Sequence, residues 1–186
     1  MVLVLGDIEY MVRDQIAQTI TVGILFVVLG LVTWATARPF LFPSLGPSAY
    51  LLAAGEGESA RASSPYHVIG GHLVAVVSGL VAFHLLAPAT DITTVLGSSS
   101  PISSTALLRF GAGSVVAMMG TTFGMLATNT NHPAACATTL IVSLGVLSTL
   151  VDGVYIVLAV TALVVLNNYL VYPAMTTLGA EPEEPR

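Results

Sequence analysis

The sequence has 186 residues, of which 55% are hydrophobic and only 8% are charged. A soluble domain of this length needs a much larger charged surface, so the composition excludes that class and indicates an integral membrane protein. The net charge is −5, and all five cationic residues are arginines that form no basic patch, which argues against nucleic acid as a partner.

The first half of the chain contains two long apolar runs with a shorter one between them. Residues 16–36 carry no charge and can cross about 30 Å of hydrocarbon as a helix. Residues 39–43 are expected to be extended, and residues 44–54 form a half-helix of only about 16 Å, so the two pieces cross together. Residues 56–65 are predicted to form an aqueous loop, and residues 68–86 form the second long span.

The second half repeats this arrangement. It is divided into a loop at 91–105, a long span at 106–127, a proline-opened half-helix from 133 to about 145, a turn near 152–153, a last span at 155–171 and a polar tail at 173–186. The predicted fold is therefore all-α and polytopic. Four long transmembrane helices and two proline-opened half-helices form one transmembrane domain over residues 1–186.

The two halves suggest an inverted repeat of three crossings each, over about 15–87 and 105–172. Aligning Phe42 with His132 places Pro43 on Pro133 and Ser48 on Thr138. An odd number of crossings per half would orient the halves oppositely, as in many secondary transporters. Coincidence between two stretches rich in proline, alanine and serine is the alternative.

The proline-opened starts point to an anion site. Proline suits the first turn of a helix, where free N–H groups carry partial positive charge. Two such starts at membrane depth, with hydroxyl groups one turn further on, would form a cradle for a small anion. The predicted binding residues are Ser44, Leu45, Gly46, Ser48, His72, Asn131, His132, Ala134, Ala135, Thr138 and Thr139.

Histidines are the titratable candidates in this set. His132 directly precedes a half-helix, where it either donates a hydrogen bond to the anion, or carries a proton with it, or only caps and packs. His72 follows two adjacent glycines, which predict close approach of another backbone, and it is either a cavity residue or an interfacial one. Arg38 and Arg109 are interpreted as interfacial anchors, with attraction of anions as the alternative for Arg109, which lies deeper. His67 and His84 are interpreted as structural.

Catalysis has little support in the sequence. No G-x-S-x-G or H-E-x-x-H motif occurs, the histidines lack the spacing of a metal site, and no cofactor motif is present. The single cysteine, Cys136, excludes an internal disulfide and is interpreted as a packing residue. We therefore expect no enzymatic activity, no catalytic residues and no bound metal or cofactor.

Three stretches together resemble the HPP family of integral membrane proteins, which includes plastid and cyanobacterial members implicated in nitrite transport. They are Phe42-Pro43-Ser44-Leu45-Gly46-Pro47-Ser48-Ala49, Ser64-Pro65 with Val68-Ile69-Gly70-Gly71-His72, and Asn131-His132-Pro133-Ala134-Ala135-Cys136-Ala137-Thr138. Two departures stand out. Ala134 replaces the second proline of the family's motif, and Tyr66-His67 stands where members often carry Arg-Asn.

The sequence and the resemblance together imply a transporter of a small inorganic anion, with nitrite as the leading substrate. An anion channel is one alternative, because a pore would use the same helix dipoles along a continuous wet path. A membrane scaffold or sensor subunit that transports nothing is the other. We expect a multi-pass protein of the cell membrane, surrounded by lipid and assembled as a homo-oligomer.

Overall fold

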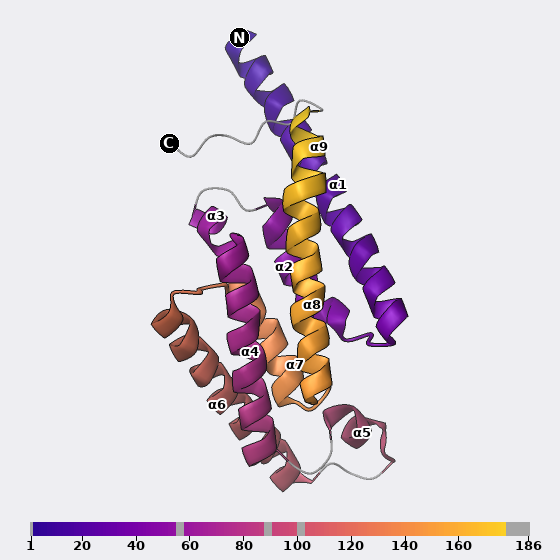
Figure 1. Ribbon diagram of the computed structural model, residues 1–186, viewed down its shortest axis with the longest axis vertical. Coiled ribbons are helices and arrows are strands. Elements are labelled where there is room, and N and C mark those ends of the chain that lie inside the picture. Colours follow the sequence, from indigo (N-terminus) through magenta and orange to yellow (C-terminus); the bar gives the residue numbers. More distant parts are fainter. Residues whose placement is uncertain (1, 55–57, 88–90, 100–102, 178–186) are drawn as a thin grey trace.

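All described elements of the computed structural model are helices (Figure 1). The structure describes residues 2–54, 58–87, 91–99 and 103–177, with side chains from residue 11 on, except those of residues 58 and 59. The elements are α1 (Val2–Thr36), α2 (Leu41–Ala54), α3 (Glu58–Ala62), α4 (Pro65–Leu86), α5 (Ile92–Gly97), α6 (Ser104–Thr128), η1 (Pro133–Ala135), α7 (Cys136–Ser143), α8 (Leu150–Leu166), η2 (Asn167–Val171) and α9 (Tyr172–Thr177).

Four of the described helical runs are long and apolar enough to cross a membrane. They are Met11–Thr36, Pro65–Leu86, Ser104–Thr128 and Leu150–Thr177, and the two shorter apolar runs are Leu41–Ala54 and Pro133–Ser143. Large apolar side chains project outward, among them Trp34, Leu85 and Phe123, which are 84%, 73% and 75% exposed. Outward apolar side chains suit lipid as the surrounding solvent. The prediction of an all-α polytopic membrane protein is confirmed.

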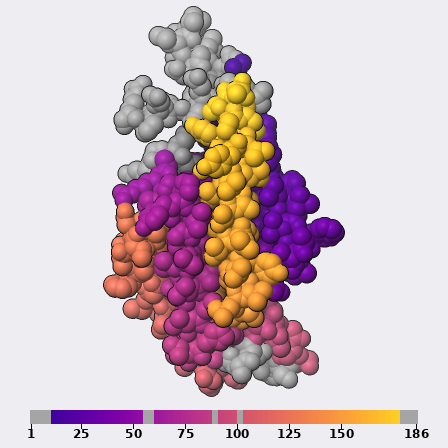
Figure 2. All heavy atoms as spheres, viewed as in Figure 1, coloured from indigo at the N-terminus to yellow at the C-terminus, as the bar shows by residue number. Residues whose placement is uncertain are grey.

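The two short helices lie inside the bundle of long ones. Contacts join α4 to α6, α7 and α8, and join α2 to α1, α7 and α8. In Figure 1, α1 and α4 run toward the end of the molecule that holds α5, while α6 and α8 run away from it. The order and direction of the elements agree with the inverted repeat, which itself stays a prediction. Figure 2 shows α8 and α9 as one column between α4 and α1.

Both half-helices differ in detail from the prediction. The expected extended segment before the first half-helix is absent, because α2 already begins at Leu41 after a tight turn in which the Phe42 N–H donates to Pro39 O at 3.3 Å. Pro43 therefore lies in the first helical turn, where a missing N–H costs nothing. The second half-helix opens at Pro133 as predicted, with one turn of 3-10 helix before α7.

The last span also begins earlier than predicted. The turn expected at 152–153 is the first turn of α8, because Thr149 and Asp152 form a capping box. The Thr149 hydroxyl accepts from the Asp152 N–H at 3.1 Å, and the Asp152 carboxylate accepts from the Thr149 N–H at 3.0 Å. The Asp152 carboxylate also forms an ion pair with Arg38 Nε at 2.6 Å, which joins the turn after α1 to the start of α8. Arg38, which is predicted to be an interfacial anchor, thus has an acidic partner.

The predicted loops and tail contain short helices. α3 lies within the predicted loop 56–65, and α5 within the predicted loop 91–105. The predicted polar tail starts inside α9, and its remainder, residues 178–186, lies outside the described residues. At the other end, α1 begins at Val2 and runs without a break into the first predicted span. These additions leave the six membrane segments unchanged.

Candidate functional site

Five polar side chains with no solvent exposure meet between the two half-helices. They are Ser44 and Ser48 of α2, His72 of α4, His132 just before η1, and Thr138 of α7. At 1.5 Å per residue, His72 lies about 10 Å along α4 from its first residue, so the group lies within the membrane-spanning part of the bundle. We call these five residues the buried chain.

Hydrogen bonds connect the buried chain from end to end. Ser44 Oγ lies 2.8 Å from Thr138 Oγ1, and Thr138 Oγ1 lies 2.8 Å from His72 Nδ1. Ser48 Oγ bridges the two imidazoles, at 2.7 Å from His72 Nε2 and 2.9 Å from His132 Nε2. His132 Nδ1 then lies 2.7 Å from the carbonyl oxygen of Ala62. The two rings are 5.4 Å apart between centroids.

The carbonyl at one end fixes the direction of every bond when both imidazoles are neutral. A carbonyl only accepts, so His132 Nδ1 carries the hydrogen and His132 Nε2 accepts from the Ser48 hydroxyl. Ser48 then accepts from the N–H of His72 Nε2, and His72 Nδ1 accepts from the Thr138 hydroxyl. Thr138 Oγ1 in turn accepts from the Ser44 hydroxyl. The Ser44 carbonyl oxygen, 3.3 Å from Thr138 Oγ1, competes for the Thr138 hydrogen with the closer His72 Nδ1. All donors therefore point from Ser44 toward Ala62, and both imidazoles are satisfied on both nitrogens.

Adjacent glycines on α4 allow this arrangement. A Cβ atom on Gly70 would lie 2.5 Å from Thr130 Cγ2, and one on Gly71 would lie 2.7 Å from His132 Cβ and 3.1 Å from the Thr130 carbonyl oxygen. Real Cβ atoms do not approach other atoms so closely, so only glycine lets the segment before η1 lie against α4. The predicted close backbone approach at Gly70 and Gly71 is confirmed.

The half-helices lie side by side and antiparallel. Ser44 pairs with Thr138 and Ser48 with His132, so residue numbers rise along α2 as they fall along the other segment. The first turns of the two half-helices consequently lie side by side, and their N-terminal ends point in opposite directions. The predicted single cradle formed by both N-terminal ends is therefore not the arrangement found. The Ser44 N–H donates to Phe40 O and the Ala135 N–H to His132 O, so neither of these amides is free for an anion.

The remaining predicted binding residues lie outside the buried chain. Leu45 belongs to the apolar core, and Gly46 faces the Phe26 ring of α1, to which a Cβ would come within 3.2 Å. Ala134 is buried in η1. Thr139 forms a separate buried pair with Thr121 of α6, with 2.8 Å between the hydroxyl oxygens. Asn131 is exposed and lines a cavity.

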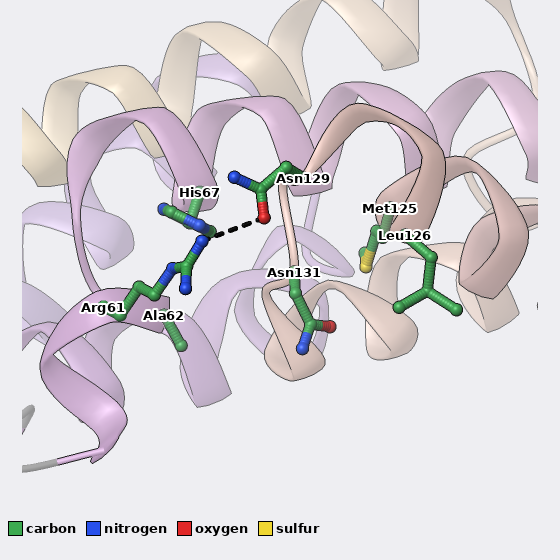
Figure 3. Close-up of a pocket in the computed structure, with 7 residues that line it drawn as sticks. All are labelled: Arg61, Ala62, His67, Met125, Leu126, Asn129 and Asn131. Carbon is green, nitrogen blue, oxygen red and sulfur yellow. Dashed lines mark hydrogen bonds between the residues drawn. The ribbon is translucent and has the colours of Figure 1, made fainter.

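That cavity, of about 220 Å³, lies next to the Ala62 end of the buried chain (Figure 3). We call it the vestibule; it is lined by Arg61, Ala62, His67, Met125, Leu126, Asn129 and Asn131. Arg61 Nη2 donates to Asn129 Oδ1 at 3.0 Å. Among the residues whose side chains the structure describes, none that lines the vestibule is acidic, and Arg61 gives it a positive charge.

Two residues that line the vestibule, Arg61 and His67, are not among the predicted binding residues. Arg61 belongs to the predicted aqueous loop, and a structural role is the prediction for His67. One signal was available for His67: it follows the helix-starting Ser64-Pro65 by one turn, and its Nδ1 indeed lies 2.7 Å from Ser64 Oγ. No sequence pattern predicts that Arg61 lies beside Asn129, because 68 residues separate them.

A comparison with known protein families shows which family the chain belongs to. A family model described as "HPP, transmembrane region" matches residues 7–178, which is nearly the whole chain. The chain belongs to the HPP family. No curated protein and no solved structure matches it. In this HPP protein, the three stretches that carried the resemblance meet in space, because Ser48, His72 and His132 each come from one of them and are joined by hydrogen bonds.

Proposed function

We propose that this HPP protein transports a small inorganic anion across the membrane, and that the anion is nitrite. The observation that supports the proposal is the buried chain: three hydroxyls and two imidazoles gathered within a bundle of membrane-spanning helices. Polar groups at this depth are costly to bury, and titratable residues within membrane segments usually serve a function. The choice of nitrite rests on the resemblance to family members that are implicated in nitrite transport.

Hydroxyl and imidazole donors are the groups that a dehydrated anion needs. Moving a bare anion into hydrocarbon costs tens of kcal/mol in the idealised Born limit, so a carrier must replace the lost hydration with donors. When both imidazoles are neutral, every donor of the buried chain already has a partner. Binding therefore requires that α2 move away from α7, which would free the hydroxyls of Ser44, Ser48 and Thr138 to face the anion.

A proton on His132 would prepare the buried chain for binding an anion. Both ring nitrogens of His132 would then donate, so Ser48 would accept from both imidazoles and its own hydroxyl hydrogen would lose its partner. That hydrogen, together with the new positive charge, would attract an anion. The close rings of His72 and His132 favour one proton per pair, since two like charges would repel. Anion and proton would cross together.

The test is nitrite uptake into proteoliposomes that contain the purified protein. The proposal predicts uptake that saturates with nitrite concentration, is inhibited by competing formate or nitrate, and is faster at external pH 5 than at pH 8. Saturation at a turnover too slow for a pore would favour a carrier over a channel. Uptake no faster than into empty vesicles would contradict the proposal, and uptake that stayed constant from pH 5 to pH 8 would remove the proton from it.

One observation favours a second candidate, a membrane scaffold or sensor subunit that transports nothing. The buried chain is closed to solvent and fully hydrogen-bonded, as expected of polar groups that only hold helices together. A scaffold of this kind needs no anion. Its melting temperature would be the same in nitrite and in an equal concentration of a large, excluded anion such as gluconate, whereas an anion carrier would be stabilised by nitrite.

A further inference from the structure

We propose that the vestibule is a binding site for a small monovalent oxyanion, distinct from the buried chain and loaded before it. The proposal rests on the proposed function for the identity of the cargo, while the site itself follows from three features of the described residues. These are a cationic guanidinium, a buried imidazole nitrogen without a partner, and direct contact with the end of the buried chain.

Arg61 supplies the charge and the geometry. A guanidinium presents five N–H donors in a planar fork that matches the two oxygens of an oxyanion such as nitrite or formate. One of these donors is used by Asn129 Oδ1 at 3.0 Å, which holds the group at the cavity wall (Figure 3). Within the described part of the chain, no carboxylate lines the vestibule to compete with an anion for the remaining donors.

His67 supplies the observation that points to a ligand. The residue is 8% exposed, lines the vestibule, and is held through Nδ1 by Ser64 Oγ at 2.7 Å. Its other nitrogen, Nε2, is buried and has no hydrogen-bond partner. An unpartnered buried polar atom is unfavourable, so a ligand that accepts from Nε2 removes this cost. In the tautomer whose Nδ1 accepts from the Ser64 hydroxyl, Nε2 carries the hydrogen that such an anion requires.

The size and position of the cavity fit the same ligand. Its volume of about 220 Å³ holds a three-atom or four-atom anion together with several waters, each of which takes about 30 Å³ in the liquid. Ala62 both lines the vestibule and accepts the hydrogen bond of His132 Nδ1, so an anion bound here lies one residue from the buried chain. The Asn131 amide lines the same wall and offers a further donor.

The experiment is a nitrite titration of the full-length protein in detergent by calorimetry, at constant ionic strength with gluconate as the balancing anion. Arg61→Gln and His67→Phe are each expected to weaken binding at least tenfold, since each removes a donor to a charged group. His67→Gln, which keeps an N–H donor, is expected to stay within about threefold of the unmodified protein. Arg109→Gln and His84→Phe are the matched controls, because both residues are exposed outside the vestibule.

The outcomes separate this proposal from the transport proposal. Ser48→Ala is expected to abolish uptake while leaving the vestibule affinity within twofold. Loss of uptake in Ser48→Ala, with nitrite affinity unchanged by Arg61→Gln and His67→Phe, would overturn the vestibule site and keep the transporter. Nitrite binding that depends on Arg61 and His67, in a protein without uptake, would keep the site and overturn the transporter. Equal weakening by the two control variants would also overturn the vestibule site.

Discussion

Two histidines on the same helix mark the difference between the buried chain and the vestibule. His72 and His67 are both at least nine-tenths buried on α4, yet His72 has a hydrogen-bond partner on each nitrogen and His67 on only one. His72 is enclosed by α2 and α7, whereas His67 lies where α3 and the end of α6 leave a cavity. A closed site must rearrange before it binds a ligand. An open site with an unpartnered donor needs only a local side-chain movement to bind one, because His67 Nε2 is itself buried.

The largest effect on stability is expected from a substitution that removes hydrogen bonds within the buried chain. Thr138→Val keeps the side-chain shape but removes the hydroxyl that contacts both Ser44 Oγ and His72 Nδ1. Two buried groups lose a partner, so we expect a loss of about 2–6 kcal/mol in the free energy of unfolding. Unfolding in mixed detergent micelles would measure it. Thr161→Val is the matched control, because the Thr161 hydroxyl bonds only to Val157 O of its own helix.

A loss equal to that of Thr161→Val would show that the buried chain contributes nothing to stability. The vestibule serves as the reference in the same measurement. His67→Phe removes the unpartnered Nε2 and a single hydrogen bond, to the half-buried Ser64 hydroxyl, so it is expected to destabilise the protein less than Thr138→Val, which takes a partner from two fully buried groups. Equal losses in the free energy of unfolding for these two variants would contradict the distinction between the fully hydrogen-bonded buried chain and the vestibule with its unpartnered donor.

An intermediate effect is expected from Gly71→Ala, which affects both regions. The added Cβ would lie 2.7 Å from His132 Cβ in the buried chain and 3.5 Å from Met125 Cε at the vestibule wall. Overpacking of this kind costs about 1–3 kcal/mol. Gly111→Ala is the control, since a Cβ there meets no atom within 4 Å, and alanine favours a helix. A melting temperature for Gly71→Ala that equals or exceeds that of Gly111→Ala would contradict the packing described.

The smallest effect is expected far from both regions, at Asp91. Its carboxylate caps α5, and hydrogen bonds from the Thr93 hydroxyl and then from the Thr94 N–H lower the pKa of Asp91 from 3.8 to about 2. Asp91→Ala should cost about 0.5–1 kcal/mol, as for other N-caps, and should leave nitrite binding unchanged. Because the pKa is lower in the folded state, this contribution is complete above about pH 4 and disappears toward pH 2. A difference between Asp91→Ala and the unmodified protein that grew on acidification would contradict this sign.

Much of the fold could be predicted from the sequence because the membrane imposes it. Long uncharged runs marked the four spans, and Pro43 and Pro133 marked the two half-helices. Gly70 and Gly71 indicated the close packing that the structure confirms. The start of α8 could also have been found, since Thr149 and Asp152 have the three-residue spacing of a capping box.

The relative placement of the half-helices could not be predicted in the same way. Proline identifies a helix start, but the offset between α2 and α7 depends on which side chains pair across 84 to 94 residues of sequence. The vestibule was missed for a similar reason: Arg61, His67 and Asn131 come together only when α3, α4 and the segment after α6 are packed. Local patterns carry no information about such contacts.

The most direct test of the account is the initial rate of nitrite uptake into proteoliposomes by Ser48→Ala, compared with Ser78→Ala. Ser48 joins the two imidazoles of the buried chain, whereas Ser78 lies on α4 beside Gly120, outside both regions. The account predicts that Ser48→Ala reduces uptake to the level of empty vesicles while Ser78→Ala transports as the unmodified protein does. Uptake by Ser48→Ala at the rate of Ser78→Ala would contradict the claim that the anion crosses through the buried chain.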